Sequence, residues 1–213
     1  MLNMKPVPLF CTSSLLIRNG KIIRNGKTLL QEPGKNPAEF LRAGYDLAGA
    51  AYPKFFKMDN LCKLAWLSAE LLCAETSFKE GYEAEQKGIF LQNASSSLDT
   101  DLKHAESISN TEAYFPSPAV FVYTLANISA GEICIRQQIK GSSAFFIFEA
   151  FEADFLLEQV QTHMNAGRIE ACIFGITEWI GNQYEACLFM VEKTAENKTE
   201  LTSEFINRMY NQS

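Results

Sequence analysis

The feature that most constrains the fold is a continuous apolar run that passes directly into a helical pattern. Residues 144–148 read AFFIF, and residues from about 150 to 165 then carry apolar side chains at helical spacing. Strands that are apolar at every position are buried on both faces, as in parallel strands covered by helices. Similar strands alternate with helices along the chain, so the sequence predicts an α/β fold with helices on both faces of a sheet.

The remaining elements follow from turns, caps and periodicity. Two Asn-Gly turns predict a hairpin of residues 15–17 and 21–23, with an extension to residue 30. Asp59 or Asn60 can cap the clearest helix, 58–75, and Asn127 can cap another that runs to about residue 138. Strands are expected at 88–91, 171–175 and 183–193, and helices at about 99–107 and 201–210. Because no linker interrupts the pattern, residues 1–213 are predicted to form a single domain.

The net charge and the cysteines limit which binding partners and which cellular compartment are expected for this chain. A net charge of −6 with scattered Lys and Arg argues against nucleic acid or an anionic membrane as the partner. No apolar run reaches the roughly 18 residues that span a bilayer, and the N-terminus lacks the pattern of a signal peptide. Six cysteines without a CxxC motif favour free thiols in a reducing cytoplasm. With only His104 and His163 available, neither a metal site nor a cofactor is expected.

A series of short motifs runs from Ser117 onward. They are Ser-Pro at 117–118, N-x-x-A-G at 127–131, I-x-I-R at 133–136, Lys-Gly at 140–141 and G-x-T-E at 175–178. In this order and spacing the chain resembles the N-terminal half of the β-ketoacyl synthases, the condensing enzymes of the thiolase fold. The resemblance implies an α/β, thiolase-like half-domain with a mixed five-stranded sheet and helices on both faces.

The nucleophile of that family is missing from this chain. In the family, Lys-Gly introduces the strand that ends at the catalytic cysteine. Counting from Gly141 puts Ala150 at that position, or Glu149 if the register slips by one. A methyl group cannot form a thiolate. The printed chain also ends before the family's second half, which supplies a histidine pair, and neither His104 nor His163 matches it. The resemblance therefore predicts no condensation by this chain alone.

These departures resemble the chain-length factors, the cysteine-less partners of active ketosynthases, and in particular the short forms of aryl polyene and flexirubin-type systems. Such a subunit pairs with an active β-ketoacyl-carrier-protein synthase of fatty-acid or polyketide-type biosynthesis and shapes the far end of its acyl tunnel. The implied partner is an active ketosynthase or a second copy of the chain, with an acyl carrier protein as a further candidate. The acyl chain, the identity of the partner and the choice between homodimer and heterodimer stay open.

Apolar residues near the expected corner form the candidate interface and tunnel wall. In the family the phenylalanine-rich strand lies at the dimer interface, where a partner covers its apolar edge. The helix near residue 128 approaches the partner's acyl tunnel. For every one of these residues, plain packing in the core is the alternative. The residues concerned are Leu125, Ile128, Ile133, Phe145, Phe146, Phe148 and Phe151.

Two other functions stay open beside the chain-length-factor reading. The first is a stand-alone acyl-thioester decarboxylase or hydrolase that uses Glu149. On a helix, Glu149 and Glu152 would share one face as an acid–base pair. Two solvated carboxylates favoured by the helix dipole are the ordinary alternative. The second function is that of a homodimeric scaffold which binds acyl groups without reaction.

The helix expected from 150 to 165 is amphipathic. Its apolar face carries Ala153, Leu157, Val160 and Met164, and carboxylates lie largely elsewhere. Burying several unpaired carboxylates would cost several kcal/mol each. We therefore expect this helix to cover a sheet on one side and to meet water or a polar partner on the other.

Overall fold

The computed structural model, which describes residues 8–109, 116–193 and 199–212, has the predicted α/β class with a larger sheet than expected. A single mixed sheet of eight strands has the order β3-β2-β1-β7-β6-β4-β5, and β8 pairs with β1. The strand β4 runs parallel to β5 and to β6, whereas the other neighbours are antiparallel. The prediction of five strands is wrong because β1 pairs with β7, which joins the N-terminal strands to the central sheet.

The elements occur in the following order along the chain: β1 (Phe10–Arg18), β2 (Lys21–Arg24), β3 (Lys27–Gln31), α1 (Pro37–Ala48), η1 (Pro53–Lys57), α2 (Asn60–Cys73), η2 (Ala84–Gln86), β4 (Lys87–Asn93), α3 (Leu98–Ser109), α4 (Pro118–Val122), α5 (Ile128–Gln137), β5 (Ser143–Ile147), α6 (Ala153–Asn165), β6 (Ala171–Ile180), β7 (Gln183–Glu192), β8 (Thr199–Glu200) and α7 (Ser203–Tyr210). The helix α1 was not predicted, although Asn36 caps it by accepting a bond from the Ala38 amide and Pro37 opens it. Such an Asn-Pro start is a recognisable helix signal.

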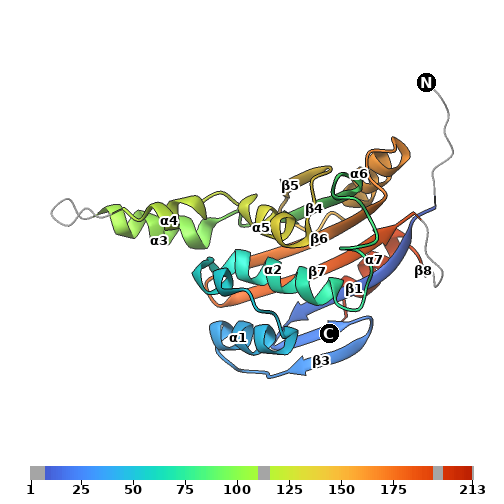
Figure 1. The fold of residues 1–213 in the computed structure, drawn as a ribbon. Helices are drawn as coiled ribbons and strands as arrows, with labels where there is room; N and C mark the ends of the chain where they lie inside the picture. Colours follow the sequence, from blue (N-terminus) through green and yellow to red (C-terminus); the bar gives the residue numbers. More distant parts are fainter. Residues whose placement is uncertain (1–7, 110–115, 194–198, 213) are drawn as a thin grey trace.

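Helices cover both faces of the sheet (Figure 1). The helices α1, α2 and α5 pack on one face, and α6 and α7 pack on the other. Alternation along each strand supplies both cores. On β4, for example, Ile89 and Leu91 belong to the core under α2, whereas Phe90 belongs to the core under α6.

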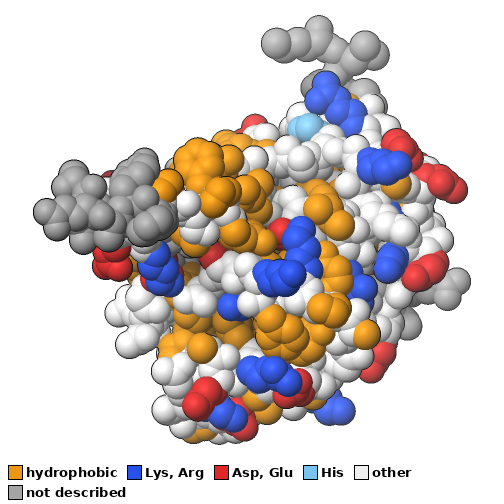
Figure 2. Space-filling model, turned by 60° about the vertical axis from the view of Figure 1, so that its left-hand side comes forward, with side chains coloured by type: hydrophobic (Ala, Val, Ile, Leu, Met, Phe, Trp, Pro, Cys, Tyr) orange, Lys and Arg blue, Asp and Glu red, His pale blue; other side chains and the backbone are white. Residues whose placement is uncertain are grey.

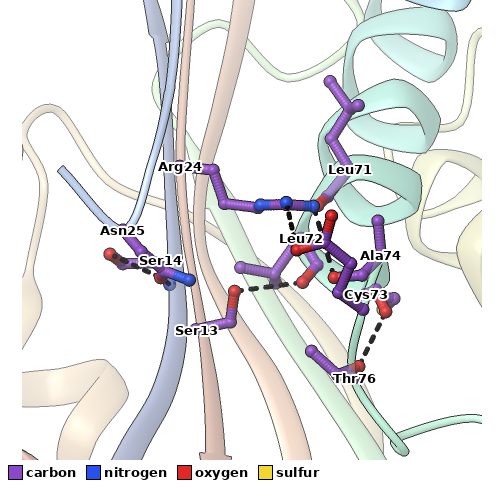
Figure 3. A network of polar contacts seen from close by, with 10 residues as sticks. Ser13, Ser14, Arg24, Asn25, Leu71, Leu72, Cys73, Ala74 and Thr76 are labelled. Atoms are coloured by element: carbon purple, nitrogen blue, oxygen red, sulfur yellow. Dashed lines mark hydrogen bonds and ion pairs between the residues drawn. The ribbon is translucent and has the colours of Figure 1, made fainter. Parts of the chain in front are cut away.

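The C-terminal end of α2 is tied to the N-terminal hairpin (Figure 3). The Arg24 guanidinium donates to the carbonyls of Leu71 and Ala74, each at 3.3 Å. The Ser13 hydroxyl donates to the Leu72 carbonyl at 3.0 Å. Because the last carbonyls of a helix have no partner within it, these side chains satisfy groups that would otherwise be left unbonded. The hairpin is thereby fastened to the main body by α2 as well as by the strand pairing.

Two cap predictions have different outcomes. Asp59 caps α2, since its Oδ1 accepts a bond from the Cys62 amide at 2.8 Å. Asn127 occupies the N-cap position of α5, but its side chain makes no capping bond. Its backbone is already helical (φ −66°, ψ −12°), whereas a capping side chain usually needs an extended backbone. The capping prediction for Asn127 is therefore wrong.

All six cysteines are free, as predicted, and four of them are buried. Within the described ranges, no helix combines the length and apolar character needed to cross a bilayer. The first seven residues, which belong to the stretch inspected for a signal peptide, lie outside the described residues.

Candidate functional site

Ala150 lies in the turn between β5 and α6. Because β5 and β6 both run parallel to β4, this turn is at the carboxyl end of three parallel strands, the edge where α/β folds usually place their sites. Both Ala150 and the neighbouring Glu149 are exposed. The helix begins at Ala153 rather than at residue 150, so the predicted start is wrong by three residues.

A buried amide on β4 holds this turn. Gln92 is fully buried, and its Nε2 donates to the Ala150 carbonyl at 2.9 Å. Its Oε1 accepts a bond from the Glu152 amide at 3.1 Å, and the Phe148 amide donates to the Asn93 carbonyl at 3.0 Å. These contacts hold the backbone out of the helix until residue 153. The sequence did carry a signal for Gln92, since it is a polar residue at the end of the apolar strand GIFL.

Glu149 and Glu152 both precede the helix. Glu152 is its N-cap residue, and its side chain makes no capping bond. The expectation that the two carboxylates share one face of a helix is therefore wrong. Both residues are exposed, so neither carboxylate has the desolvated surroundings that usually tune an acid–base catalyst.

The phenylalanines around the turn are half-buried, and they include residues that pack against each of the two cores. Phe145 packs against the core under α2 and α5, and Phe146 packs against the core under α6. Because β5 is the last strand at this end of the sheet, its outer side has no partner strand among the described residues. The sequence did not single out Ile147 on this strand, which is 57% exposed. The closest ring pairs are Phe146–Phe155 and Phe148–Phe155, both with centroids 4.9 Å apart, and Phe151–Tyr210 at 4.7 Å.

The three aliphatic candidates near α5 have different environments. Leu125 is 52% exposed just before the helix, and Ile128 is half-buried against the core. Ile133 is completely buried under the sheet, so the expectation that it contributes to an interface or tunnel is corrected: it is a core residue. The exposed isoleucine of this helix is Ile135, two positions further along the chain.

The helices α3 and α4 project from the sheet as an arm, defined here as residues 98–109 and 116–125 (Figure 1). The two helices pack on each other, with the His104 and Phe121 rings 5.6 Å apart. Apolar side chains gather beside the grey atoms at the left of Figure 2. Sequence reasoning singled out only Leu125 of this set. The large apolar residues that are exposed on the arm are Leu98, Leu102, Ile108, Phe121, Val122 and Leu125.

A groove of about 250 Å³ lies between the arm and the start of α2. Its walls include the apolar side chains of Met58 and Val120, and Lys57 and Lys103 also line it. Burial lowers the pKa of Lys63, nearby on α2; the charge of Asp59 opposes this shift and the charge of Lys103 adds to it. The groove thus has two lysines and one carboxylate, Asp59, beside its apolar side chains, and Lys103 is paired with Asp99 at 2.5 Å.

The histidines lie away from the Ala150 turn. His104 is on the arm, and His163 lies in the last turn of α6, the end opposite Ala150. His163 Nδ1 is 2.7 Å from the Ser142 hydroxyl, and burial lowers the pKa of this imidazole. In the part of the chain that is described, no group of three or more His, Cys, Asp or Glu side chains is placed to hold a metal ion.

The helix α6 has the amphipathic character predicted for it. Its buried residues are Ala153, Leu156, Val160 and Met164. The predicted apolar face contained Leu157 in place of Leu156, and Leu157 is only half-buried. The outer face carries exposed polar side chains such as Glu158 and Thr162. The helix therefore covers the sheet on one side and needs no apolar layer on the other.

Known proteins resemble this chain in fold, at low sequence identity. No family model matches the sequence, and no curated protein matches it. Among solved structures, the ishigamide ketosynthase/chain length factor matches with a TM-score of 0.64 at 17% identity, over 91% of this chain and 64% of that chain. The ketosynthase ApeO in complex with its chain length factor ApeC from Xenorhabdus doucetiae matches with a TM-score of 0.57 at 14% identity, over 96% and 92%.

A third match is a β-ketoacyl synthase from Burkholderia phymatum STM815, with a TM-score of 0.57 at 10% identity, over 87% of this chain and 59% of that chain. The chain thus spans less than two thirds of the matched chain in the ishigamide and Burkholderia structures, and nearly all of it in the Xenorhabdus complex. At these identities the likeness concerns the fold alone. The chain has the thiolase-like fold of the ketosynthases and chain length factors.

Proposed function

We propose that this chain is a non-catalytic, chain-length-factor-type subunit, working as one domain in the cytoplasm, that pairs with an active ketosynthase. The observation that carries the proposal is the exposed apolar surface of the arm, which leads directly into α5. Contiguous apolar patches of this kind mark binding surfaces, because burying them gains about 25 cal/mol per Å². The solved relatives of this fold include ketosynthases in complex with chain length factors.

The turn at Ala150 supports the absence of condensing chemistry. We take Ala150 as the counterpart of the family's nucleophile, with Glu149 as the alternative if the register is shifted. Gln92 holds the turn in shape, yet the residue presented there has only a methyl group, which cannot attack a thioester. We therefore propose that the chain contributes a binding surface to the complex and no catalytic group. Leu125 and Phe121 on the arm are our candidates for the wall of the partner's acyl tunnel.

Co-expression with a ketosynthase from the same organism tests the pairing. Light scattering of the purified material should show a stable complex that contains one copy of each chain. Recovery of the two proteins in separate peaks would count against the proposal. A homodimeric scaffold, the blander alternative, predicts instead that this chain dimerises alone and that adding the ketosynthase changes nothing.

A stand-alone enzyme that uses Glu149 is the second candidate function. The wild-type chain and the Glu149→Ala variant would be incubated with malonyl-carrier protein, and released CO₂ and free acyl groups would be measured. The proposed function predicts no turnover by either protein. Turnover by the wild type that the substitution abolishes would favour the enzyme instead.

We propose that an acyl carrier protein is a further partner, docked at the groove beside Lys57 and Lys103. One solved relative of this fold is a ketosynthase in complex with a type II acyl-carrier protein. Two lysines beside an apolar opening would suit an acidic partner that carries an apolar group. The double variant Lys57→Glu/Lys103→Glu should weaken binding of acyl-carrier protein to the complex, whereas Lys27→Glu on β3 should not. Equal binding of acyl-carrier protein by both variants would rule out this groove as the docking site.

A further inference from the structure

Glu178, the last residue of the G-x-T-E motif, binds the loop that leads into the arm. Its carboxylate accepts bonds from the backbone amides of Ala94 at 2.6 Å and Ser95 at 3.2 Å, and from the Ser95 hydroxyl. The amide of Trp179 donates to the same carboxylate at 3.1 Å. Among the ion pairs of the described residues, none involves Glu178. The half-buried charge is therefore satisfied by hydrogen-bond donors, three of which belong to the loop.

The first turn of α3 is tied to the body at two further points. Gly181, in the turn between β6 and β7, donates its amide proton to Asp99 at 3.0 Å. The Thr100 hydroxyl donates to Asp59 at 2.6 Å, and Asp59 is also the cap of α2. Together with Glu178, these bonds connect the base of the arm to β6, to the turn that follows it and to α2.

The loop between β4 and the arm is held in a conformation that its sequence does not favour. Ser96 has φ +53°, a left-handed value that is uncommon for residues other than glycine. The Asn93 side chain closes around it, with bonds of 2.8 Å to the Ser96 carbonyl and 3.0 Å from the Ser96 amide. The Ser97 hydroxyl then donates to the Thr124 carbonyl at 2.6 Å, which ties the start of α3 to the end of the arm. Such a backbone persists only where its surroundings determine it.

We infer that Glu178 is a positioning residue whose carboxylate fixes the direction of the arm before any partner binds. Most large apolar side chains of the arm are exposed, and Tyr123 is the one that packs against the main core, so the orientation of the arm depends largely on these bonds at its base. A binding surface that is ordered in advance loses less conformational entropy when the partner arrives. The part of the inference that concerns the partner rests on the proposed function, whereas the ordering of the arm does not.

Glutamine is the informative replacement because it keeps the size of the side chain and changes its chemistry. One carboxylate oxygen becomes an NH₂ group, which cannot accept a bond and would face an N–H or O–H donor of the loop. The matched control is Glu158→Gln on the polar outer face of α6, which removes one negative charge from an exposed position. The variant Glu178→Asp keeps the charge but shortens its reach by one methylene.

Hydrogen exchange on the isolated chain tests the ordering of the arm without a partner. In Glu178→Gln, amides of residues 94–109 should exchange about tenfold faster than in the wild type, while β4 and β6 keep their protection. Glu158→Gln should match the wild type, and Glu178→Asp should lie between the two. Unchanged exchange at 94–109, or an equal loss of protection in β4 and β6, would overturn the inference. If Glu178→Gln fails to fold, the same comparison made with Glu178→Asp decides it.

Partner binding is the second measurement. Against a ketosynthase that binds the wild type, Glu178→Gln should weaken the affinity about tenfold, whereas Glu158→Gln should leave it unchanged. Equal affinities for the two variants would overturn the role in partner binding. If no ketosynthase binds the wild type, the proposed function fails, and the exchange experiment still decides whether Glu178 orders the arm.

Discussion

At the scale of single residues, Gly175 on β6 has the least freedom to change. Its φ of +146° is rare for residues with a side chain, and an added Cβ would lie 2.0 Å from the Cys187 carbonyl oxygen on β7. Gly175→Ala should therefore lower the free energy of unfolding by about 3 kcal/mol or more, measured by urea denaturation. The matched control is Gly131→Ala in α5, where a methyl group meets nothing within 4 Å and should add up to about 1 kcal/mol. Equal losses at both positions would contradict this account.

A new thiol at Ala150 tests whether the turn is open. Burial raises the pKa of the Cys11 thiol to about 12 and that of Cys134 to about 11, so the native thiols should react slowly at pH 8. Ala150→Cys should add one fast-reacting thiol per chain in a disulfide-exchange assay with a chromogenic reagent. Ala171→Cys, at a fully buried strand position, should add none. A thiol at 150 as slow as one at 171 would show that the turn is closed.

At the scale of elements, substitutions on the arm should affect partner binding without affecting the stability of the isolated chain. Phe121 and Val122 on α4 are 56% and 47% exposed, so charges there disturb little in the isolated chain. The double variant Phe121→Asp/Val122→Asp should unfold within about 0.5 kcal/mol of the wild type but should no longer bind the ketosynthase. Leu47→Asp on α1, also exposed, should keep both properties. Retained binding by the double variant in a pull-down would show that the arm is not the interface.

At the scale of the whole molecule, the buried thiols predict a loss of stability in alkaline solution. Burial raises the pKa of all six cysteines above the ordinary value of 9.0. The folded chain then holds protons that the unfolded chain releases, so this stabilisation is complete below pH 9 and declines as the pH rises toward 11 and 12. The midpoint of urea unfolding, measured in reductant from pH 8 to 11, should fall steadily. Cys172→Ala, which removes one such thiol, should show a smaller decline, and a flat profile would contradict the prediction.

Local patterns in the sequence were enough to predict part of this protein. Continuous apolar strands and amphipathic helices indicated the α/β class with helices on both faces, because periodicity alone reports which side of an element is buried. Apolar surroundings indicated that the cysteines are free. The order of short motifs indicated a ketosynthase-like fold, and the residue type at position 150 was enough to show that no thiol is present there.

Only the tertiary structure decided the rest, since it depends on contacts between residues far apart in the chain. The pairing of β1 with β7 joined the N-terminal strands to the central ones in one sheet of eight strands, and Gln92, 58 positions before Ala150, delayed the start of α6. Ile133 and Ile135 are both isoleucines on one helix, yet the sheet buries the first and leaves the second in solvent. The direction of the arm likewise depends on residues far apart in the chain, because β6 bonds to a loop 84 positions earlier. Periodicity locates an apolar face, but only the assembled fold determines whether another part of the same chain covers it.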